Sequence, residues 1–375
     1  MLYSVSNIGS NVSRLGSLDF LRGIAILGVI YLHLAGNFLS QNSNLSKVAF
    51  LGSFGVPLFF LVSAYTMCLM WNRRIGEGNP VASFYIRRFF RIAPLFWIAM
   101  IGYIILNGIE PTFWAPNGIG PRQIILSSLF LHEFDPYSIN AVVPGGWSIG
   151  IEMCFYALFP FLILRLDSAK KCLFAALSIW FLLGFGGAML EANILASEPI
   201  YAKLYSEFFY FSLFTQLPVF LLGMYVFYEV SAKNSNDNWP LVIGIIIFWI
   251  SLSALGKFGL GLNTRPLFWG PILLLSGLVI VTIRSGYQIR LINSFGEMSY
   301  SVYLIHFAVI TAVNNLFKLV GYSEQSLERF ALATVLVLAI SWILGRLSKA
   351  TLEQWSVALG RWVLNFYVSR RNRKK

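Results

Sequence analysis

The sequence predicts an all-α fold, a polytopic membrane helix bundle of about ten transmembrane helices plus one short re-entrant or interfacial helix. Hydrophobic residues make up 57% of the 375 residues and charged residues only 12%, against about 25% charged residues in soluble domains. Apolar stretches long enough to cross a bilayer recur along the chain. The 33 Phe, 17 Tyr and 11 Trp suit lipid-facing surfaces and interfacial belts.

The helices are expected wherever an apolar window reaches spanning length. These windows lie at about 18–38, 50–71, 89–107, 147–165, 172–190, 208–229, 240–256, 266–283, 298–318 and 330–347. The segment 123–132 is apolar but short, and counting it as a span would place the later basic loops outside. We therefore predict a re-entrant or interfacial helix there.

One membrane domain is expected at 18–347, between a cytoplasmic segment at 1–17 and a basic cytoplasmic tail at 348–375. Residues 1–17 lack the pattern of a removable signal peptide, so the first span is expected to remain as an anchor.

The net charge of +12 is best explained by orientation in the membrane. With both termini in the cytoplasm, the predicted outer segments hold only seven of the 28 Lys and Arg, which are Lys47, Arg122, Lys203, Lys257, Arg265, Lys318 and Arg329. Cytoplasmic loops of membrane proteins are enriched in exactly these residue types, so no nucleic-acid partner is needed to explain them. The three cysteines lack metal-ligand spacing, and no metal site is predicted.

Arg22 and His33 lie eleven residues apart in the first span. Eleven residues of α-helix return to the same face after about 16 Å, so a cation and an imidazole share one stripe at two depths. Arg22 alone would suit a snorkelling anchor, with Asp19 within pairing distance one turn earlier, and His33 alone would suit a hydrogen-bonded core position. Ionisable groups at membrane depth are costly, so the pair favours function.

Arg88 and Arg91 form the second cluster, at the start of the third span. Topology explains the neighbouring Arg87 well, but apolar residues flank Arg91 and the span continues beyond it. Two guanidinium groups spaced three residues apart suit phosphate oxygens better than lysines would. A phosphate-bearing donor on the cytoplasmic side is the natural inference.

Glu152 enters the membrane from the outer side, to about the depth of His33, and shares a helix face with Ser148 and Tyr156. A buried carboxylate beside a buried imidazole can orient the ring and stabilise its protonated form. The alternative is a structural Glu bonded to neighbouring hydroxyl groups.

A second polar stripe, Ser299, Tyr303 and His306, is expected to make helix–helix hydrogen bonds or to line a cavity. His132, in the outer region, is expected to be solvated.

Five stretches, taken together and in order, resemble the bacterial acyltransferase family 3, integral-membrane O-acyltransferases of surface carbohydrates. The resemblance covers about residues 14–350, and the stretches are Leu18–His33, Phe54–Ser63, Arg87–Pro94, Gly146–Glu152 and Ser299–His306. Ala64 stands where many members have Gly, which makes a close backbone approach there less certain. Some members continue into a soluble esterase-like domain, which this chain is expected to lack.

The resemblance implies catalytic roles for His33 and Glu152, and an acyl-donor site at Arg22, Arg88 and Arg91. Supporting roles are expected for Asp19, Ser63, Trp147, Ser148, Tyr156, Tyr300, Tyr303 and His306. The implied reaction moves an acyl group, most simply acetyl, from cytoplasmic acyl-CoA to a hydroxyl of a polysaccharide, lipopolysaccharide or lipid-linked glycan at the outer face. The expected location is the bacterial inner membrane. Acyl-CoA would be a substrate, and no permanently bound cofactor is expected.

Two other classes of function stay open at this stage. A proton-coupled exporter of a glycolipid or small metabolite would also use intramembrane His, Glu and Arg, although no convincing internal repeat is found. A non-catalytic assembly partner in polysaccharide synthesis would tolerate loss of His33. The oligomeric state is not indicated by the sequence.

Overall fold

The computed structural model describes residues 12–40, 43–182, 201–232, 269–322 and 326–372, and in these ranges the regular structure is helical. In chain order the named elements are α1 (Val12–Phe38), α2 (Asn44–Ala49), η1 (Phe50–Phe54), α3 (Gly55–Arg74), α4 (Pro80–Asn107), α5 (Pro121–Ser128), η2 (His132–Phe134), α6 (Gly146–Arg165), α8 (Ala202–Phe211), α9 (Leu213–Ser231), α11 (Trp269–Ser285), α12 (Arg290–Glu297), α13 (Ser299–Leu319), α14 (Leu327–Ser348), η5 (Lys349–Glu353) and α15 (Gln354–Asn372).

The all-α polytopic bundle is confirmed. Seven helical segments in the described ranges are long and apolar enough to cross a membrane, and α11 with α12 would add an eighth as one bent span. The expected window at 172–190 is helical through residue 182, beyond which it leaves the described residues. The window at 240–256 lies outside the described residues altogether.

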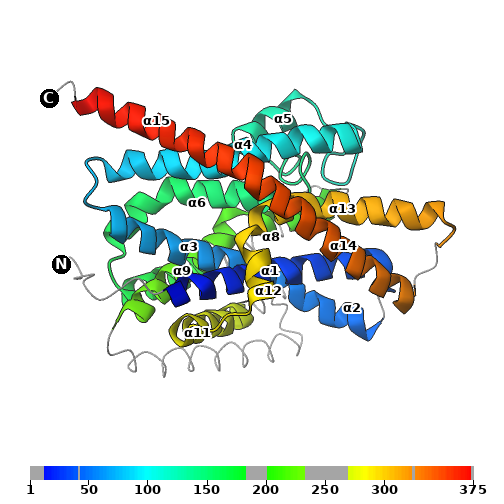
Figure 1. The fold of residues 1–375 in the computed structure, drawn as a ribbon, viewed down its shortest axis with the longest axis horizontal. Coiled ribbons are helices and arrows are strands. Elements are labelled where there is room, and N and C mark those ends of the chain that lie inside the picture. Colours follow the sequence, from blue (N-terminus) through cyan, green and yellow to red (C-terminus); the bar gives the residue numbers. More distant parts are fainter. Residues whose placement is uncertain (1–11, 41–42, 183–200, 233–268, 323–325, 373–375) are drawn as a thin grey trace.

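The main helices run side by side along the long axis of the molecule (Figure 1). We name the left-hand end of this view the terminal end. It holds the start of α1, the turn between α3 and α4, and the end of α15. α2, α5 and the connection from α13 to α14 lie toward the other side, the opposite end. Charge patterning predicts that these two groups of elements lie on opposite sides of the membrane.

α4 begins at Pro80, nine residues before the predicted start of its span. Asn79 caps the helix by accepting a hydrogen bond from the Ala82 N–H, and Pro fits the first helical position because its missing N–H is not needed there. The longer helix carries Arg88 and Arg91 in a regular helical backbone rather than in a loop. Their spacing of three residues therefore translates into a shared face.

The residues expected as a basic tail continue α14 through η5 into α15. The segment Leu327–Arg370 is 44 residues long, about 66 Å as a helix and roughly twice the apolar thickness of a bilayer. α15 packs along α4, where Asn79 Nδ2 donates to Tyr367 Oη at 2.9 Å and a Cβ on Gly360 would lie 2.7 Å from Phe90 Cβ. The residues of the predicted basic tail that the structure describes therefore form a helix packed against α4.

α12 crosses α1 at close range after a bend of 114° from α11. A Cβ on Gly296 would lie 1.7 Å from the carbonyl oxygen of Asp19, and one on Gly23 would lie 2.1 Å from that of Ile292. Only glycine fits both positions, because each meets rigid backbone. The contact fixes α1 against the start of α13 beside Arg22.

The short segment predicted at 123–132 overlaps most of α5, which is too short to span a membrane, and reaches the first residue of η2. The prediction of a solvated His132 is wrong, because its side chain is 2% exposed and its Nε2 lies 3.0 Å from the Gly146 carbonyl oxygen. Gly150 makes this possible, since a Cβ there would lie 2.8 Å from His132 Nε2. Glu133 beside it is also 2% exposed, and neither carboxyl oxygen has a hydrogen-bond partner among the described residues.

Gly296→Ala is expected to destabilise the protein despite the better helix propensity of Ala. The added methyl meets the Asp19 carbonyl, and overpacking of this kind costs roughly 1–3 kcal/mol. Gly102→Ala in α4 is the matched control, because nothing lies within 4 Å of its Cβ position. Thermal unfolding of both variants in detergent checks the prediction. Equal melting temperatures for the two variants would contradict it.

Burial raises the pKa of Glu133 from 4.5 to about 7. The folded state therefore favours the protonated carboxyl, and the associated stability is present below pH 4.5 and lost as pH rises through 7. At pH 8, Glu133→Gln should increase the free energy of unfolding by up to about 3 kcal/mol and so raise the melting temperature. At pH 4.5 it should leave the melting temperature unchanged. Melting curves across this range test the sign, with the exposed Glu110→Gln as control. A shift equal at both pH values would refute it.

Candidate active site

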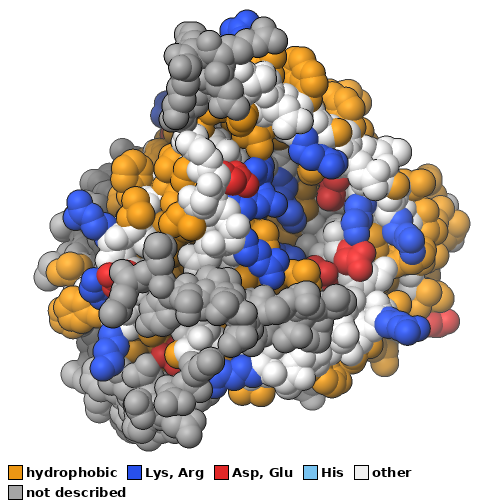
Figure 2. Space-filling view, turned by 60° about the vertical axis from the view of Figure 1, so that its left-hand side comes forward, with side chains coloured by type: hydrophobic (Ala, Val, Ile, Leu, Met, Phe, Trp, Pro, Cys, Tyr) orange, Lys and Arg blue, Asp and Glu red, His pale blue; other side chains and the backbone are white. Residues whose placement is uncertain are grey.

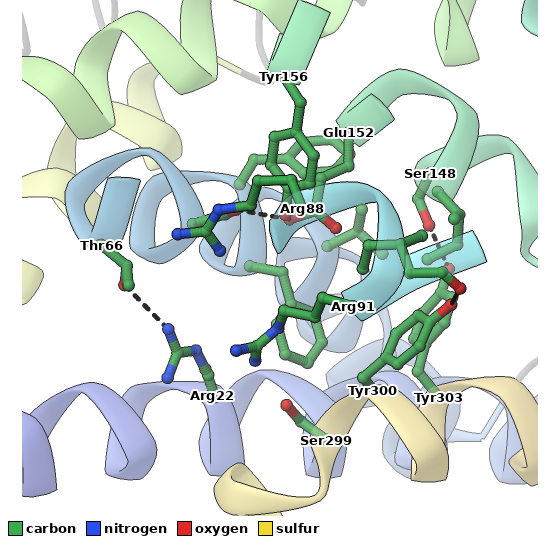
Figure 3. A pocket seen from close by; sticks show the side chains of 16 residues that line it. Arg22, Thr66, Arg88, Arg91, Ser148, Glu152, Tyr156, Ser299, Tyr300 and Tyr303 are labelled. Atoms are coloured by element: carbon green, nitrogen blue, oxygen red, sulfur yellow. Dashed lines mark hydrogen bonds between the residues drawn. The ribbon is translucent and has the colours of Figure 1, made fainter. Parts of the chain in front are cut away.

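An inner cavity of about 80 Å³ lies between α1, α3, α4, α6 and α13. Arg22 enters it from α1, and Arg88 and Arg91 enter it from α4, so that the three guanidinium groups converge (Figure 3). Seen from the terminal end, Lys and Arg side chains gather around a hollow in the surface (Figure 2). The resemblance grouped these three arginines in one expected site, and the structure places them in one cavity.

Arg22 is held on both sides. Its Nη1 pairs with Asp19 Oδ1 at 3.1 Å, which confirms the expected partner, and its Nη2 donates to Thr66 Oγ1 at 2.9 Å. Thr66 in turn donates to the Val62 carbonyl oxygen, so its lone pairs face the guanidinium. Thr66 was missed from the sequence. A hydroxyl three residues after Ser63, in a span of otherwise apolar residues, was the available signal.

Arg88 and Arg91 have no ion pair with a carboxylate among the described residues, unlike Arg87, whose Nη2 lies 2.8 Å from Glu77 Oε2. Arg88 lies over the Tyr156 ring at 5.6 Å, a cation–π contact that leaves its N–H groups available. Arg91 is exposed at the cavity wall. The cavity therefore carries positive charge that an anionic ligand can neutralise.

Glu152 accepts two short hydrogen bonds inside the same cavity. Ser63 Oγ and Tyr156 Oη each lie 2.5 Å from Glu152 Oε1. Ser148, Glu152 and Tyr156 all line this cavity, as their spacing on one helix face predicted. Ser299, Tyr300 and Tyr303 line it from α13, and Tyr300 donates to the Ile92 carbonyl oxygen of α4 at 2.7 Å.

His33 lies in a second, outer cavity of about 790 Å³. Its ring centroid is 4.3 Å from that of Phe307 and 5.5 Å from that of His306. Trp147 lines the same cavity. His306 is fully buried, and its Nδ1 lies 2.6 Å from the Tyr303 carbonyl oxygen of its own helix. The expected helix–helix hydrogen bond of His306 is thus not found in the described part of the chain.

Tyr303 and Val56 line both cavities and form the wall between them. The Tyr303 hydroxyl donates to the Gly145 carbonyl oxygen at 3.0 Å and lies 2.8 Å from Ser148 Oγ. These contacts join α13 to α6, so the helix–helix role expected of this stripe holds for Tyr303. Gly145 has a φ of +78°, and its N–H donates to Asn140 Oδ1 at 2.7 Å, which fixes the turn that presents the carbonyl.

We expected Glu152 to lie beside His33 and orient its ring. Instead the two side chains line different cavities, and no hydrogen bond joins them in the described part of the chain. Ser63 and Tyr156 both donate to Glu152 Oε1 and hold the carboxylate in the inner cavity, which Arg88 also lines.

The site thus consists of two cavities. The inner cavity is cationic, and the wider outer cavity, on the other side of Tyr303, holds the His33 imidazole. Phosphate oxygens suit the first, and proton transfer suits the second. Among the described residues no group of three or more His, Cys, Asp or Glu side chains could hold a metal ion.

Comparison with known proteins agrees with this geometry. The chain is 26% identical over 273 residues to the exopolysaccharide production protein ExoZ of Rhizobium meliloti, covering 70% of this chain and 78% of that protein. It is 26% identical over 375 residues to the acyltransferase MdmB of Streptomyces mycarofaciens, covering 91% of both. Staphylococcus aureus relatives that carry O-acetyltransferase in their names are 25% identical over 80% of this chain and 51% of their own.

No solved structure gives a significant match. The sequence model of the acyltransferase 3 family, described as an acyltransferase domain, matches residues 15–346. This chain is therefore a multi-pass membrane acyltransferase and belongs to the acyltransferase 3 family.

Proposed function

We propose that this protein transfers an acyl group, most simply acetyl, from cytoplasmic acyl-CoA to a hydroxyl of a surface carbohydrate or lipid-linked glycan. The observation that carries the proposal is the pair of cavities, one with three arginines and one with His33, which share Tyr303 and Val56 as a wall. The terminal end of the bundle would face the cytoplasm, in a bacterial inner membrane. The polysaccharide in the name of ExoZ and the acetyl group named in the staphylococcal relatives support this choice.

The donor would bind with its phosphates on Arg88 and Arg91. Guanidinium groups offer paired N–H donors in a fixed plane, which matches phosphate oxygens. Arg22 would contribute from the opposite wall, held ready by Asp19 and Thr66. The slender pantetheine arm would then pass along α1 toward His33, roughly 16 Å from Arg22 along the helix axis.

In the proposed transfer step, His33 accepts the proton of the acceptor hydroxyl as its oxygen attacks the thioester carbonyl. The C–O bond forms, the C–S bond breaks, and the proton passes from the imidazole to the departing CoA sulfur. The product is an ester and free CoA. A covalent acyl-His intermediate is the less favoured variant of the same step.

Glu152 would act from the inner cavity through its charge. A carboxylate in a low-dielectric interior stabilises a cation without touching it, so it can favour protonated His33 across the wall as well as balance Arg88. Two variants of Glu152 test this role. Glu152→Gln should lower kcat and shift the pH profile of transfer, whereas Glu152→Asp should retain part of the activity.

His33→Ala should abolish transfer while leaving donor binding and protein levels intact. General-base catalysis contributes about 10²–10⁴-fold, which sets the scale of the loss. The assay supplies labelled acetyl-CoA to the terminal side of membrane vesicles and follows label into glycan. His132→Gln, a buried histidine outside both cavities, is the control that should keep activity per folded protein. Substantial transfer by His33→Ala, or solute flux without label transfer, would reject the proposal.

Arg88→Lys and Arg91→Lys should each weaken donor binding about tenfold, because Lys cannot make the paired hydrogen bonds. The matched control is Arg87→Lys, since Arg87 pairs with Glu77 outside the cavity. Titration of CoA into the purified protein measures the affinity directly. An equal loss in all three variants would point to general surface charge rather than a donor site.

A further inference from the structure

The outer cavity differs in charge from the inner one. Its lining residues in the described part of the chain include no Lys or Arg, and they include one carboxylate, Glu207. The inner cavity holds three guanidinium groups around Glu152. An anionic ligand is therefore favoured in the inner cavity and disfavoured in the outer cavity.

Gln216 lines the outer cavity and carries a buried acceptor oxygen without a hydrogen-bond partner among the described residues. Its side chain is 2% exposed, and Nε2 donates to the Tyr210 carbonyl oxygen at 2.9 Å. That bond fixes the amide, and Oε1 has no hydrogen-bond partner among the described residues. A buried acceptor without a partner costs roughly 1–3 kcal/mol, which a ligand hydroxyl would recover.

Asn140 adds a donor at the same cavity. Its Oδ1 is used by the Gly145 N–H, so the amide is oriented and its nitrogen is the group left for a ligand. Amide donors and acceptors together match a hydroxyl, which both gives and accepts a hydrogen bond.

An aromatic wall completes the site. Phe211 lies between Trp147, at a ring centroid distance of 4.1 Å, and Trp114, at 5.7 Å, and all three line the cavity. The C–H faces of a pyranose ring pack on such surfaces while its hydroxyl groups point sideways to polar partners. Apolar walls with a few placed polar groups are the general form of small-ligand sites.

We propose that the outer cavity is the acceptor subsite and that it selects a neutral pyranose ring. The ring packs on the aromatic wall of Trp114, Phe211 and Trp147, its hydroxyl groups bond to Gln216 and Asn140, and Glu207 repels anionic sugars. His33 lines the same cavity, so the acceptor hydroxyl has its base at hand. This inference rests on the proposed acyl transfer to carbohydrate and adds which ring is held and by which residues.

The test compares two probes that differ at one carbon, methyl glucopyranoside and methyl glucuronide, together with the corresponding galactose pair. Binding to the purified full chain in nanodiscs is followed by saturation-transfer NMR. We expect at least one neutral glycoside to bind saturably and at least tenfold more tightly than its uronide. Gln216→Leu should weaken the neutral glycoside at least fivefold while CoA affinity stays unchanged, which shows that the variant is folded.

Glu207→Gln separates the charge effect from general packing. It should bring the uronide to within about twofold of the neutral glycoside, whereas Glu110→Gln should leave the discrimination intact. Absence of saturable binding by any neutral glycoside overturns the inference, as does discrimination that persists in Glu207→Gln. Sugar binding without label transfer from acyl-CoA supports the subsite and rejects the proposed activity. Label transfer to glycan without saturable binding of any neutral glycoside rejects the subsite and supports the proposed activity.

Discussion

The arrangement of this protein depends on keeping three guanidinium groups inside a helix bundle. Charges at membrane depth cost several kcal/mol unless partners or a polar opening compensate them. Arg22 has the Asp19 carboxylate and the Thr66 hydroxyl, and Arg88 has the Tyr156 ring. Arg91 lines the same cavity and is exposed. These compensating contacts come from three different helices, α1, α3 and α6, so the charge of the site depends on how the helices pack.

The close packing of helices around this site depends on glycine. Gly23 and Gly296 let α12 lie against α1 at a distance that any side chain would prevent. The sharp bend before α12 then brings the start of α13 beside α1. Ser299 and Tyr303 reach the cavities because of this close crossing. A bundle built on regular ridge-and-groove spacing would hold the α13 side chains farther from α1.

Much of this could be read from sequence, and the limits have physical causes. Hydropathy located the spans, and helical spacing placed Ser148, Glu152 and Tyr156 on one face, because both depend on local order. Which face meets which neighbour depends on tertiary packing, so spacing could indicate the Tyr156 partner of Glu152 on its own helix but not the Ser63 partner on α3. His132 was expected in solvent because nothing local reveals that Gly150 leaves room for its ring. Thr66 and Gln216 were missed for the same reason.

The tyrosine wall between the two cavities has a consequence for the cell. A wide aqueous passage through this bundle would let protons run down their gradient, and energy stored across the membrane would dissipate. Tyr303, whose hydroxyl is hydrogen-bonded to Gly145 and Ser148, separates the two cavities together with Val56. The thioester arm of the proposed acyl-CoA donor would be slim enough to enter this constriction and would fill it while bound. An acyl group could in this way be transferred across the membrane without an open pore.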